Sequence, residues 1–415
     1  MTVIVHKYGG TSLADVPTMR HAARRIIEAK RQGHDVAVTV SAMGGTTDAL
    51  LALARQASSD PPAREIDALL ATGESASAAL LASILNDLGH PARSLTGWQA
   101  GLITDASHGD AHIVEANVAR VWQCLREGTI PVVAGFQGIA GATDDITTLG
   151  RGGSDTTAVA LAAALDAAQC EIYTDVDGVF TADPRIVVTA RRIPHLSYPQ
   201  MLRAAESGAK VLHSRCIEHA RQTRTPVLVR SSFSDGPGTW VTAADGSTQA
   251  KVHTVAHRRG QTLITVHMET SPENGAAHIA QVLSDVTMTA LTPDPCADAG
   301  QTIHVTLPSG EGKRAMAALT AAQSETGIVH LENIDATGVV SIIGTALSPS
   351  DAICTLFTSA LRNAGAKVHL VTATPNCVSA VCTDSDLPAA VASVHSAFGL
   401  DRDLQDVSLK ALSLA

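Results

Sequence analysis

Short runs of β-branched residues alternate with Ala- and Leu-rich amphipathic stretches from the N-terminus to about residue 235. Val3–Val5, for example, precedes a helical pattern over Pro17–Gln32, which Gly33 ends. Strands that alternate with helices form a mainly parallel sheet covered by helices on both faces. Further helices are expected from about Asp48, over Glu74–Leu88 and over Thr156–Ala168, and further strands over Val36–Val40, Pro131–Ala134, Glu171–Tyr173 and Val227–Val229. The alternation therefore predicts an α/β fold for this part of the chain.

The pattern changes after about residue 260. Before that point, Ser234–Gly238 has strong turn chemistry and Thr242–Ser247 is small and polar, which is typical of a linker. Beyond it, two segments of similar length each combine strands with a helix in a βαβ order, which suggests a weak internal repeat. The sequence therefore predicts an α/β domain over 1–241, a linker over 242–260, and two small units over 261–337 and 338–415.

Composition limits the partners of the chain. Its 30 basic and 40 acidic residues give a net charge of −10, which argues against nucleic acid or an anionic membrane as the main partner. The seven cysteines are scattered, as is typical of reduced thiols in a cytosolic protein. We find no signal peptide before the first strand and no apolar run that approaches the ~20 residues needed to cross a bilayer. A soluble, cytoplasmic protein is therefore expected.

Glycine- and hydroxyl-rich turns follow several predicted strands, where open α/β sheets bind ligands. In the first turn, Lys7–Ser12, the glycines would let backbone N–H groups approach phosphate oxygens, although an ordinary turn explains them too. The second turn, Ser41–Asp48, is also consistent with a simple helix N-cap. The third, Thr72–Ser75, places Glu74 in the first turn of a predicted helix. That carboxylate is either favoured by the helix dipole alone or a counter-charge for a substrate ammonium.

The fourth turn, Thr147–Thr157, is the most informative. Arg151 is flanked by three glycines and leads into an apolar helix that Ser154 and Asp155 would cap. Flexible glycines cost conformational entropy, and a guanidinium suits bidentate capture of a carboxylate. Because the helix N-terminus adds affinity for an anion, the pattern favours a binding site over an ordinary loop.

Two further segments offer polar groups. Tyr173–Arg185 is an irregular stretch after a strand, rich in turn residues, in which Phe180 is the aromatic residue beyond Tyr173; a long connection would by itself also account for it. Gly208–His213 places Lys210 late in a predicted helix after Tyr198. A charge at the C-terminal end of a helix would by itself account for this lysine.

Taken together, these segments resemble the aspartate kinase family, whose members have the amino-acid kinase fold. The resemblance spans Val3 to about Val241 in order and spacing, and it is carried by Lys7–Ser12, Ser41–Asp48, Gly150–Thr157, Thr174–Arg185 and Gly208–Leu212. It implies a three-layer domain with a mainly parallel central sheet. It also implies that two ACT-like, ferredoxin-type βαββαβ units follow this domain.

The resemblance assigns a role to each matching residue. Glu74 would pair the ammonium of L-aspartate and Arg151 would clamp its α-carboxylate, and the substrate-binding set would be Ser41, Thr47, Glu74, Arg151, Gly152, Gly153 and Ser154. The nucleotide-binding set would be Lys7, Gly9, Gly10, Thr174, Asp175, Phe180, Asp183, Arg185, Lys210 and Val211. Lys7, Arg151, Asp155 and Lys210 would be catalytic, with Asp155 orienting the two lysines. Phe180 stands where the family commonly has Tyr, so a stacking role survives without a hydroxyl contact.

The implied reaction moves the γ-phosphoryl group of ATP to the β-carboxylate of L-aspartate, giving 4-phospho-L-aspartate and ADP. In the family this is the first step toward lysine, threonine and methionine, or of a related specialised pathway. Phosphoryl transfer requires positioning and charge neutralisation, and a carboxylate is already a nucleophile at pH 7. A site without an evident catalytic His fits this chemistry. Mg²⁺ would be held mainly by the ATP phosphates, since no metal cage is evident.

Two other interpretations stay open at this point. One is an enzyme of the same fold that phosphorylates another acceptor, such as glutamate, N-acetylglutamate, carbamate or UMP. The other is a non-catalytic amino-acid sensor. Glu74 with Arg151 favours a free α-amino acid, because an N-acetylated substrate would leave the buried carboxylate unpaired. The retained Lys7, Arg151 and Lys210 argue against a sensor.

The C-terminal units depart from the family pattern. ACT pairs of this family normally dimerise and bind lysine or threonine as feedback inhibitors. The expected Pro-Gly turns are replaced by Ser271–Gly275 and Ser348–Asp351, and the effector-contacting runs by Thr287–Thr292 and Thr372–Asn376, where Pro375 lacks a strand donor. We therefore expect a homodimer or higher homo-oligomer through the ACT-like units, with weakened or lost inhibition by lysine plus threonine.

Overall fold

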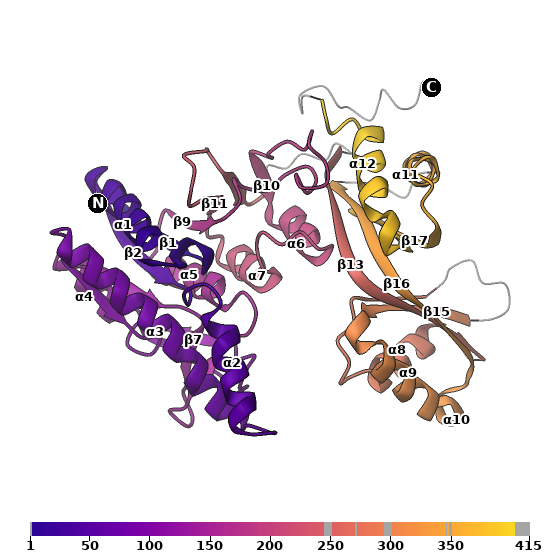
Figure 1. Ribbon diagram of the computed structural model, residues 1–415, viewed down its shortest axis with the longest axis horizontal. Coiled ribbons are helices and arrows are strands. Elements are labelled where there is room, and N and C mark those ends of the chain that lie inside the picture. Colours follow the sequence, from indigo (N-terminus) through magenta and orange to yellow (C-terminus); the bar gives the residue numbers. More distant parts are fainter. Residues whose placement is uncertain are drawn as a thin grey trace. The chain divides into compact units, whose positions relative to one another are not determined.

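The computed structural model describes residues 2–244, 251–269, 272–293, 301–345, 347 and 351–402. Its contacts divide the chain into two compact units (Figure 1). The first comprises Met1–Val179, Arg192–Ala205 and Lys210–Ser247, and the second Phe180–Arg191, Glu206–Ala209 and Thr248–Ala415. Ser271, Ser348–Ser350 and residues 245–250 of the predicted linker lie outside the described residues.

The first unit is built on an eight-stranded sheet with the order β10-β12-β11-β9-β1-β2-β6-β3. Every neighbouring pair is parallel except β11 and β12, which confirms the predicted mainly parallel sheet. The strands are β1 (Thr2–Tyr8), β2 (His34–Val40), β3 (Ala92–Leu95), β6 (Ile130–Ala134), β9 (Gln169–Thr174), β10 (His195–Ser197), β11 (Val227–Ser231) and β12 (Thr239–Thr242).

Helices cover both faces of this sheet because its strand residues alternate in direction. On β1, Ile4 and Tyr8 pack into a core with α1 (Val16–Arg31) and α3 (Ala63–Asp87). Lys7 points the other way, toward Asp155 on α5 (Gly153–Ala164). The remaining helices of the unit are η1 (Thr11–Leu13), α2 (Thr46–Ala57), α4 (Ala119–Arg126), α6 (Tyr198–Glu206) and α7 (Ser214–Thr223). The three layers expected from the sequence are present.

A second, four-stranded sheet with the order β5-β4-β7-β8 completes the first unit. It consists of β4 (Leu102–Thr104), β5 (Ile113–Ala116), β7 (Gln137–Ala140) and β8 (Ile146–Thr148). This sheet was not expected, because each of its strands has only three or four residues. It matters for the site because β8 leads directly into the Arg151 turn.

Helix α3 begins eleven residues earlier than predicted, at Ala63 rather than Glu74. Gly73 suggested a boundary, but it lies inside the helix where a side chain has no room: a Cβ there would be 3.0 Å from the Cβ of Ala42. By length and composition α3 could span a membrane, which was not expected from the sequence. More than half of its apolar stretch is buried inside the protein, as in a core helix.

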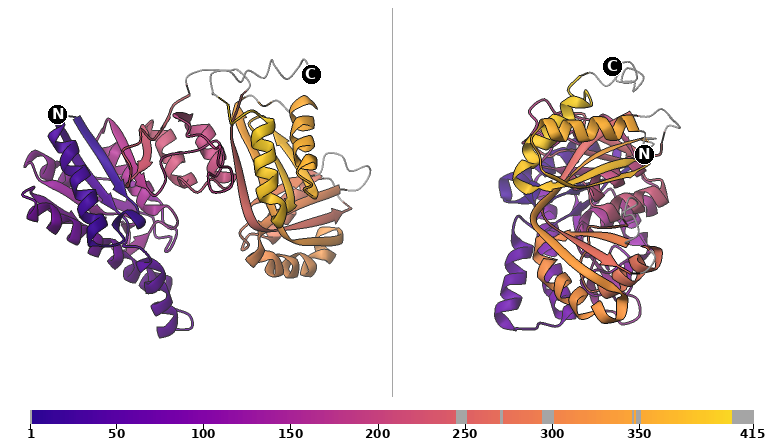
Figure 2. Two further views of the ribbon diagram at one scale, coloured as in Figure 1. Left: turned by 45° about the horizontal axis from the view of Figure 1, so that its top comes forward. Right: turned by 90° about the vertical axis from the view of Figure 1, so that its right-hand side faces the viewer.

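The second unit is built on a six-stranded antiparallel sheet with the order β14-β15-β13-β16-β18-β17. Figure 2 shows the strands and helices of this part of the chain, coloured from orange to yellow, in two further views. Its strands are β13 (Lys251–Met268), β14 (Ala290–Pro293), β15 (Gln301–Pro308), β16 (Ile328–Thr345), β17 (Val368–Thr374) and β18 (Cys377–Thr383). Its helices are α8 (Pro272–Val282), η2 (Ser309–Glu311), α9 (Gly312–Ala321), α10 (Gln323–Thr326), α11 (Asp351–Asn363), η3 (Asp384–Asp386) and α12 (Leu387–Ala397).

Two separate cores form on this one sheet. Ile264 and Leu319 belong to the core that contains α8 and α9, whereas Phe357 and Val394 belong to the core that contains α11 and α12. The long central strands β13 and β16 contribute residues to both cores. The two ACT-like units are therefore joined by continuous strands, and β13 begins at Lys251, within the segment predicted as a linker.

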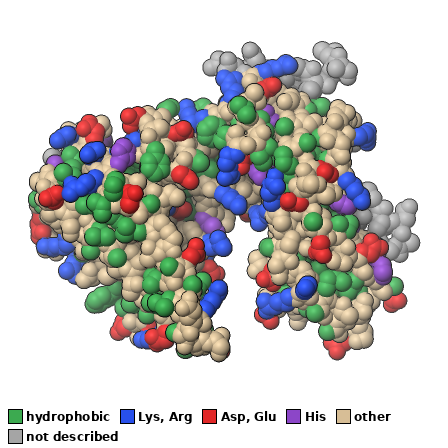
Figure 3. Space-filling model, viewed as in Figure 1, with side chains coloured by type: hydrophobic (Ala, Val, Ile, Leu, Met, Phe, Trp, Pro, Cys, Tyr) green, Lys and Arg blue, Asp and Glu red, His purple; other side chains and the backbone are tan. Residues whose placement is uncertain are grey.

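Charged side chains lie mainly at the surface, and acidic and basic groups are interspersed on the face seen in Figure 3. Among the described residues, only four Lys, Arg, Asp or Glu residues are buried: Lys7, Asp67, Glu74 and Glu171. All four belong to the first unit. Because such groups are seldom fully buried without a partner or a function, they mark where the site is to be sought.

Candidate active site

Lys7 and Asp155 meet at the carboxyl end of β1. The Lys7 Nζ lies 2.6 Å from Asp155 Oδ1, and both side chains are largely shielded from solvent. Gly9 follows this lysine, and a Cβ on Gly9 would lie 3.5 Å from the ammonium nitrogen. The Gly9 N–H donates to the Tyr173 carbonyl near the end of β9, 3.3 Å away. The first predicted turn and the start of the Tyr173–Arg185 stretch are thus neighbours.

The second turn packs directly against the first. The Gly44 N–H donates to the Gly10 carbonyl at 3.1 Å, and a Cβ on Gly10 would lie 3.0 Å from the Ala42 carbonyl oxygen. Only glycine allows so close an approach of the two backbones. The N-cap of α2 is Gly45, with no side-chain hydrogen bond, so the interpretation of Thr47 or Asp48 as a helix cap is wrong.

Glu74 lies in the middle of α3 and is almost completely buried. Its position rules out the explanation by a helix dipole, which acts only on the first and last turns. Glu74 Oε1 accepts the Ala42 N–H at 3.0 Å, whereas Oε2 has no hydrogen-bond partner among the described residues. Burial raises the pKa of Glu74 to about 7. An unpartnered buried carboxylate oxygen of this kind is costly unless a ligand supplies the donor.

The Arg151 turn has a fixed backbone and an exposed side chain. Gly150 and Gly152 both have positive φ angles, 68° and 70°, and a Cβ on Gly152 would lie 2.2 Å from the His213 side chain. The N-cap of α5 is Gly152, without a side-chain hydrogen bond, so the expectation that Ser154 and Asp155 cap the helix is wrong.

Ser154 and Asp155 instead lie in the first turn of α5. The N–H groups of a first helical turn have no partner inside the helix and suit an anion. Arg151 forms no ion pair with any residue that the structure describes, so its guanidinium is available beside these groups.

The sequence predicts that Lys210 lies late in a helix, and this prediction is wrong. Helix α6 ends at Glu206, and Gly208, with a φ of 109°, is incompatible with helix continuation. Lys210 and Val211 follow in the turn before α7, and Lys210 is exposed. A helix dipole therefore does not account for this lysine, contrary to the simplest interpretation of the sequence.

The remaining predicted nucleotide-binding residues fall into different units. Thr174 and Asp175 belong to the first unit, and Phe180, Asp183 and Arg185 to the second. Arg185 pairs with Asp183 at 2.7 Å. That all five line one nucleotide site stays a prediction.

Sequence reasoning missed Asp67, the most deeply buried acid of the first unit. It lies seven residues before Glu74 on α3, which places both on one face of the helix. That spacing of two acids within an apolar segment was the available signal. Among the described residues, no group of three His, Cys, Asp or Glu side chains is arranged to hold a metal ion.

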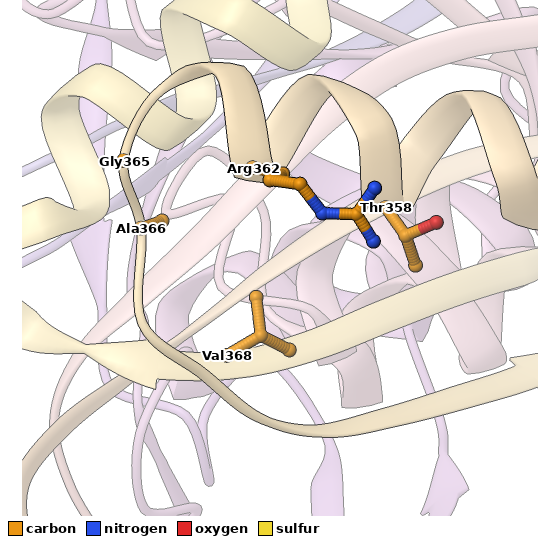
Figure 4. Close-up of a pocket in the computed structure, with 5 residues that line it drawn as sticks. All are labelled: Thr358, Arg362, Gly365, Ala366 and Val368. Atoms are coloured by element: carbon orange, nitrogen blue, oxygen red, sulfur yellow. The ribbon is translucent and has the colours of Figure 1, made fainter.

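One cavity, of about 440 Å³, belongs wholly to the second unit. It is lined by Thr358 and Arg362 of α11 and by Gly365, Ala366 and Val368, with the Arg362 guanidinium beside Thr358 (Figure 4). None of the predicted site residues lines it.

The doubly covered parallel sheet, with glycine turns and Lys7 at its strand ends, has the architecture expected of an amino acid kinase. In agreement, the model of the amino acid kinase family matches residues 2–231. The aspartokinase of Mycolicibacterium smegmatis is 45% identical over 410 residues, which cover 97% of each chain. That of Corynebacterium glutamicum is 42% identical over 407 residues, covering 96% of this chain and 97% of its own. The chain belongs to the aspartokinase family and is an ATP-dependent aspartate kinase.

Solved structures agree on the fold. Aspartokinase III of E. coli, in complex with aspartate and ADP, matches with a TM-score of 0.80 and 24% identity, covering 96% of this chain and 100% of its own. Aspartate kinase from Synechocystis matches with a TM-score of 0.54 and 35% identity, covering 95% of this chain and 69% of its own. ACT-like domains fit the C-terminal half of the chain in this fold.

Proposed function

We propose that the β-carboxylate of L-aspartate attacks the γ-phosphorus of ATP at the carboxyl ends of β1 and β2, and that Glu74 and Arg151 hold the amino acid. The observation that carries this proposal is the buried, unpartnered Oε2 of Glu74. A substrate ammonium supplies the missing donor and the compensating charge. Since the bound ammonium favours the ionised carboxylate, binding lowers the pKa of Glu74 again.

The α-carboxylate of the substrate is assigned to Arg151. A guanidinium binds a carboxylate through two parallel hydrogen bonds, and Gly152 and Ser154 at the N-terminal turn of α5 add N–H donors. Gly153 lies beside them, with its own N–H donated to the Gly150 carbonyl at 3.1 Å. Ser41 and Thr47, from the second turn, complete the substrate site in this proposal. With both ends of the amino acid fixed, only the β-carboxylate is left to react.

The ATP phosphates are assigned to Lys7, Gly9, Gly10 and Lys210. Asp155 orients Lys7, consistent with their 2.6 Å contact. Fixed cations of this kind neutralise the charge that develops on the transferred group. The proposed nucleotide site also includes Thr174, Asp175, Phe180, Asp183, Arg185 and Val211.

Mg²⁺ is assigned mainly to the phosphates themselves, because this ion commonly binds through substrate phosphates, waters and few carboxylates. The metal would neutralise phosphate charge during transfer. No protein general base is required, since the attacking carboxylate is ionised at neutral pH.

The proposal extends to the cellular setting. The enzyme acts in the cytoplasm, on the pathway to lysine, threonine and methionine or a related specialised one. It assembles as a homodimer or higher oligomer through the ACT-like units, with relaxed feedback inhibition.

A coupled ADP-release assay with a panel of acceptors tests this function. L-aspartate should support turnover, whereas N-acetyl-L-aspartate, L-glutamate and carbamate should support little. Glu74→Gln should raise the KM for L-aspartate at least tenfold, the effect of losing a charge-assisted hydrogen bond. Equal turnover with N-acetyl-L-aspartate would refute the role of Glu74, and no turnover with any acceptor would favour a sensor.

A further inference from the structure

We propose that Asp67 is a positioning residue for L-aspartate: it fixes the Arg151 turn through the segment of residues 105–112. This inference rests on the proposed role of Arg151. The segment connects β4 to β5, so it emerges from the small sheet rather than from the main sheet. Asp67 itself lies on α3, within the core, and has no direct contact with Arg151 among the contacts that the structure shows.

Asp67 is a fully buried carboxylate with three donors around it. Its Oδ1 accepts the Thr148 hydroxyl at 2.5 Å, and its oxygens lie 3.0 and 3.1 Å from the Gly109 N–H. His108 Nδ1 lies 2.8 Å from Oδ2, and because a carboxylate only accepts, this nitrogen is the donor. The carboxylate thereby joins three elements: α3, the 105–112 segment and the end of β8.

The 105–112 segment lies against the backbone that leads to Arg151. The Ala111 N–H donates to the Thr148 carbonyl at 2.9 Å. A Cβ on Gly150 would lie 2.7 Å from Asp110 Oδ1 and 3.1 Å from the Gly109 carbonyl oxygen. The residue immediately before Arg151 is therefore enclosed by this segment, and a displaced segment would free the Arg151 turn.

A second side chain holds the same junction. Arg215, on α7, donates to the Leu149 carbonyl at 2.7 Å and pairs with Asp110 Oδ1 at 2.9 Å. Asp67 and Arg215 thus fix the segment and the 148–150 backbone together. Neither residue belongs to the proposed substrate-binding set, so in this proposal both act through Arg151.

The location of Asp67 gives this arrangement a functional meaning. Asp67 and Glu74 are seven residues apart on α3, or about 10 Å along the helix axis. One rigid helix therefore carries the proposed ammonium ligand and anchors the turn that carries the proposed carboxylate ligand. The separation of these two ligands is what distinguishes a free α-amino acid from other carboxylates. An error of about 1 Å in such a separation is costly for a bound substrate.

The test uses the full-length enzyme with Asp67→Asn and, as a gentler change, Thr148→Val. Each variant weakens the clamp but leaves every proposed substrate ligand intact. We expect the KM for L-aspartate to rise about tenfold, with the KM for ATP changed by less than about twofold. The control is Asp87→Asn, an exposed residue of the same helix that pairs with Arg20; both KM values should stay unchanged. A merely structural role would lower the thermal midpoint and the active fraction and leave both KM values as they were.

A double-variant cycle separates this inference from the proposed function. Arg151→Ala should raise the KM for L-aspartate, and adding Asp67→Asn should raise it no further, since the clamp acts through Arg151. If Arg151→Ala raises this KM but neither Asp67→Asn nor Thr148→Val does, the inference alone is overturned. If Arg151→Ala leaves it unchanged, the proposed role of Arg151 falls, and the inference with it.

Discussion

At the scale of single residues, Glu74 links protonation to both stability and binding. Burial raises the pKa of Glu74 to about 7, above its ordinary value of 4.5, so the folded protein holds this proton more tightly than the unfolded chain. The contribution of Glu74 to stability is complete below about pH 4.5 and is lost as the pH rises through about 7. Binding of L-aspartate has the opposite pH dependence, because the substrate ammonium pairs with the ionised carboxylate of Glu74.

The first prediction follows from this opposition. The KM for L-aspartate should fall between about pH 6 and about pH 8, while the thermal midpoint of the free enzyme declines relative to that of Glu74→Gln. In Glu74→Gln both pH dependences should flatten. Initial rates and thermal unfolding of both proteins, measured across this pH range, test the prediction. An unchanged pH profile of KM in the variant would show that another group titrates.

The two lysines provide the second prediction. Lys7→Ala and Lys210→Ala should each lower kcat a hundredfold or more, because each removes stabilisation of the transferred group, roughly 2.7 kcal/mol. Lys313→Ala, which removes an exposed lysine of α9, serves as the control and should have normal kinetics. Near-normal turnover in either of the first two variants would contradict the assignment of that lysine.

At the scale of elements, the backbone of the Arg151 turn is sensitive to one added carbon atom. Gly152→Ala combines a positive φ with a Cβ only 2.2 Å from the His213 side chain. Gly89→Ala is a matched control, because Gly89 has a φ of 80° and nothing within 4 Å of the added atom. Backbone strain of about 1–2 kcal/mol is common to both variants. We predict that only Gly152→Ala loses aspartate binding, by tenfold or more in KM. If the KM for L-aspartate rose equally in Gly152→Ala and Gly89→Ala, backbone strain rather than the close contact with His213 would explain the loss of binding.

The sequence identified elements better than it identified their ends. The parallel strands carry their own signal in β-branched residues, and so do the glycine turns that follow them. Gly73 suggests a turn before a helix that starts at Glu74, but it lies inside α3, where it is required for close packing against Ala42. Lys210 was placed in a helix that in fact ends before Gly208. Both errors come from tertiary contacts that a local pattern does not contain.

The sequence also predicts the residues of the candidate site better than it predicts the contacts between them. Lys7 and Asp155 are 148 positions apart, and their contact depends on the direction in which β1 presents each side chain. Family resemblance pointed to both residues, but periodicity alone did not join them. The hydrogen-bond network of Asp67 is not predictable from the sequence, because its partners lie on short strands and on a loop that have no periodic pattern of apolar residues.

At the scale of the whole molecule, the ACT-like half bears on regulation. The resemblance to the family predicts effector-contacting runs at Thr287–Thr292 and Thr372–Asn376. Strand β14 (Ala290–Pro293) overlaps the first run, whereas Pro375 of the second lies in the turn between β17 and β18, so the prediction that it removes a strand donor is wrong. We predict that millimolar lysine plus threonine leaves the rate of aspartate phosphorylation nearly unchanged. The coupled assay with both amino acids, added singly and together, gives the answer. Strong inhibition by the pair would show that effector binding has been retained through other residues.

In the proposed mechanism, Glu74 and Arg151 fix L-aspartate so that its β-carboxylate alone receives the phosphoryl group. The most direct measurement traps the product with hydroxylamine and identifies the hydroxamate by mass spectrometry and comparison with authentic standards. With ATP and L-aspartate, we expect the β-hydroxamate of aspartate in amounts equal to the ADP released. ADP release without that product, or formation of the α-hydroxamate, would contradict it.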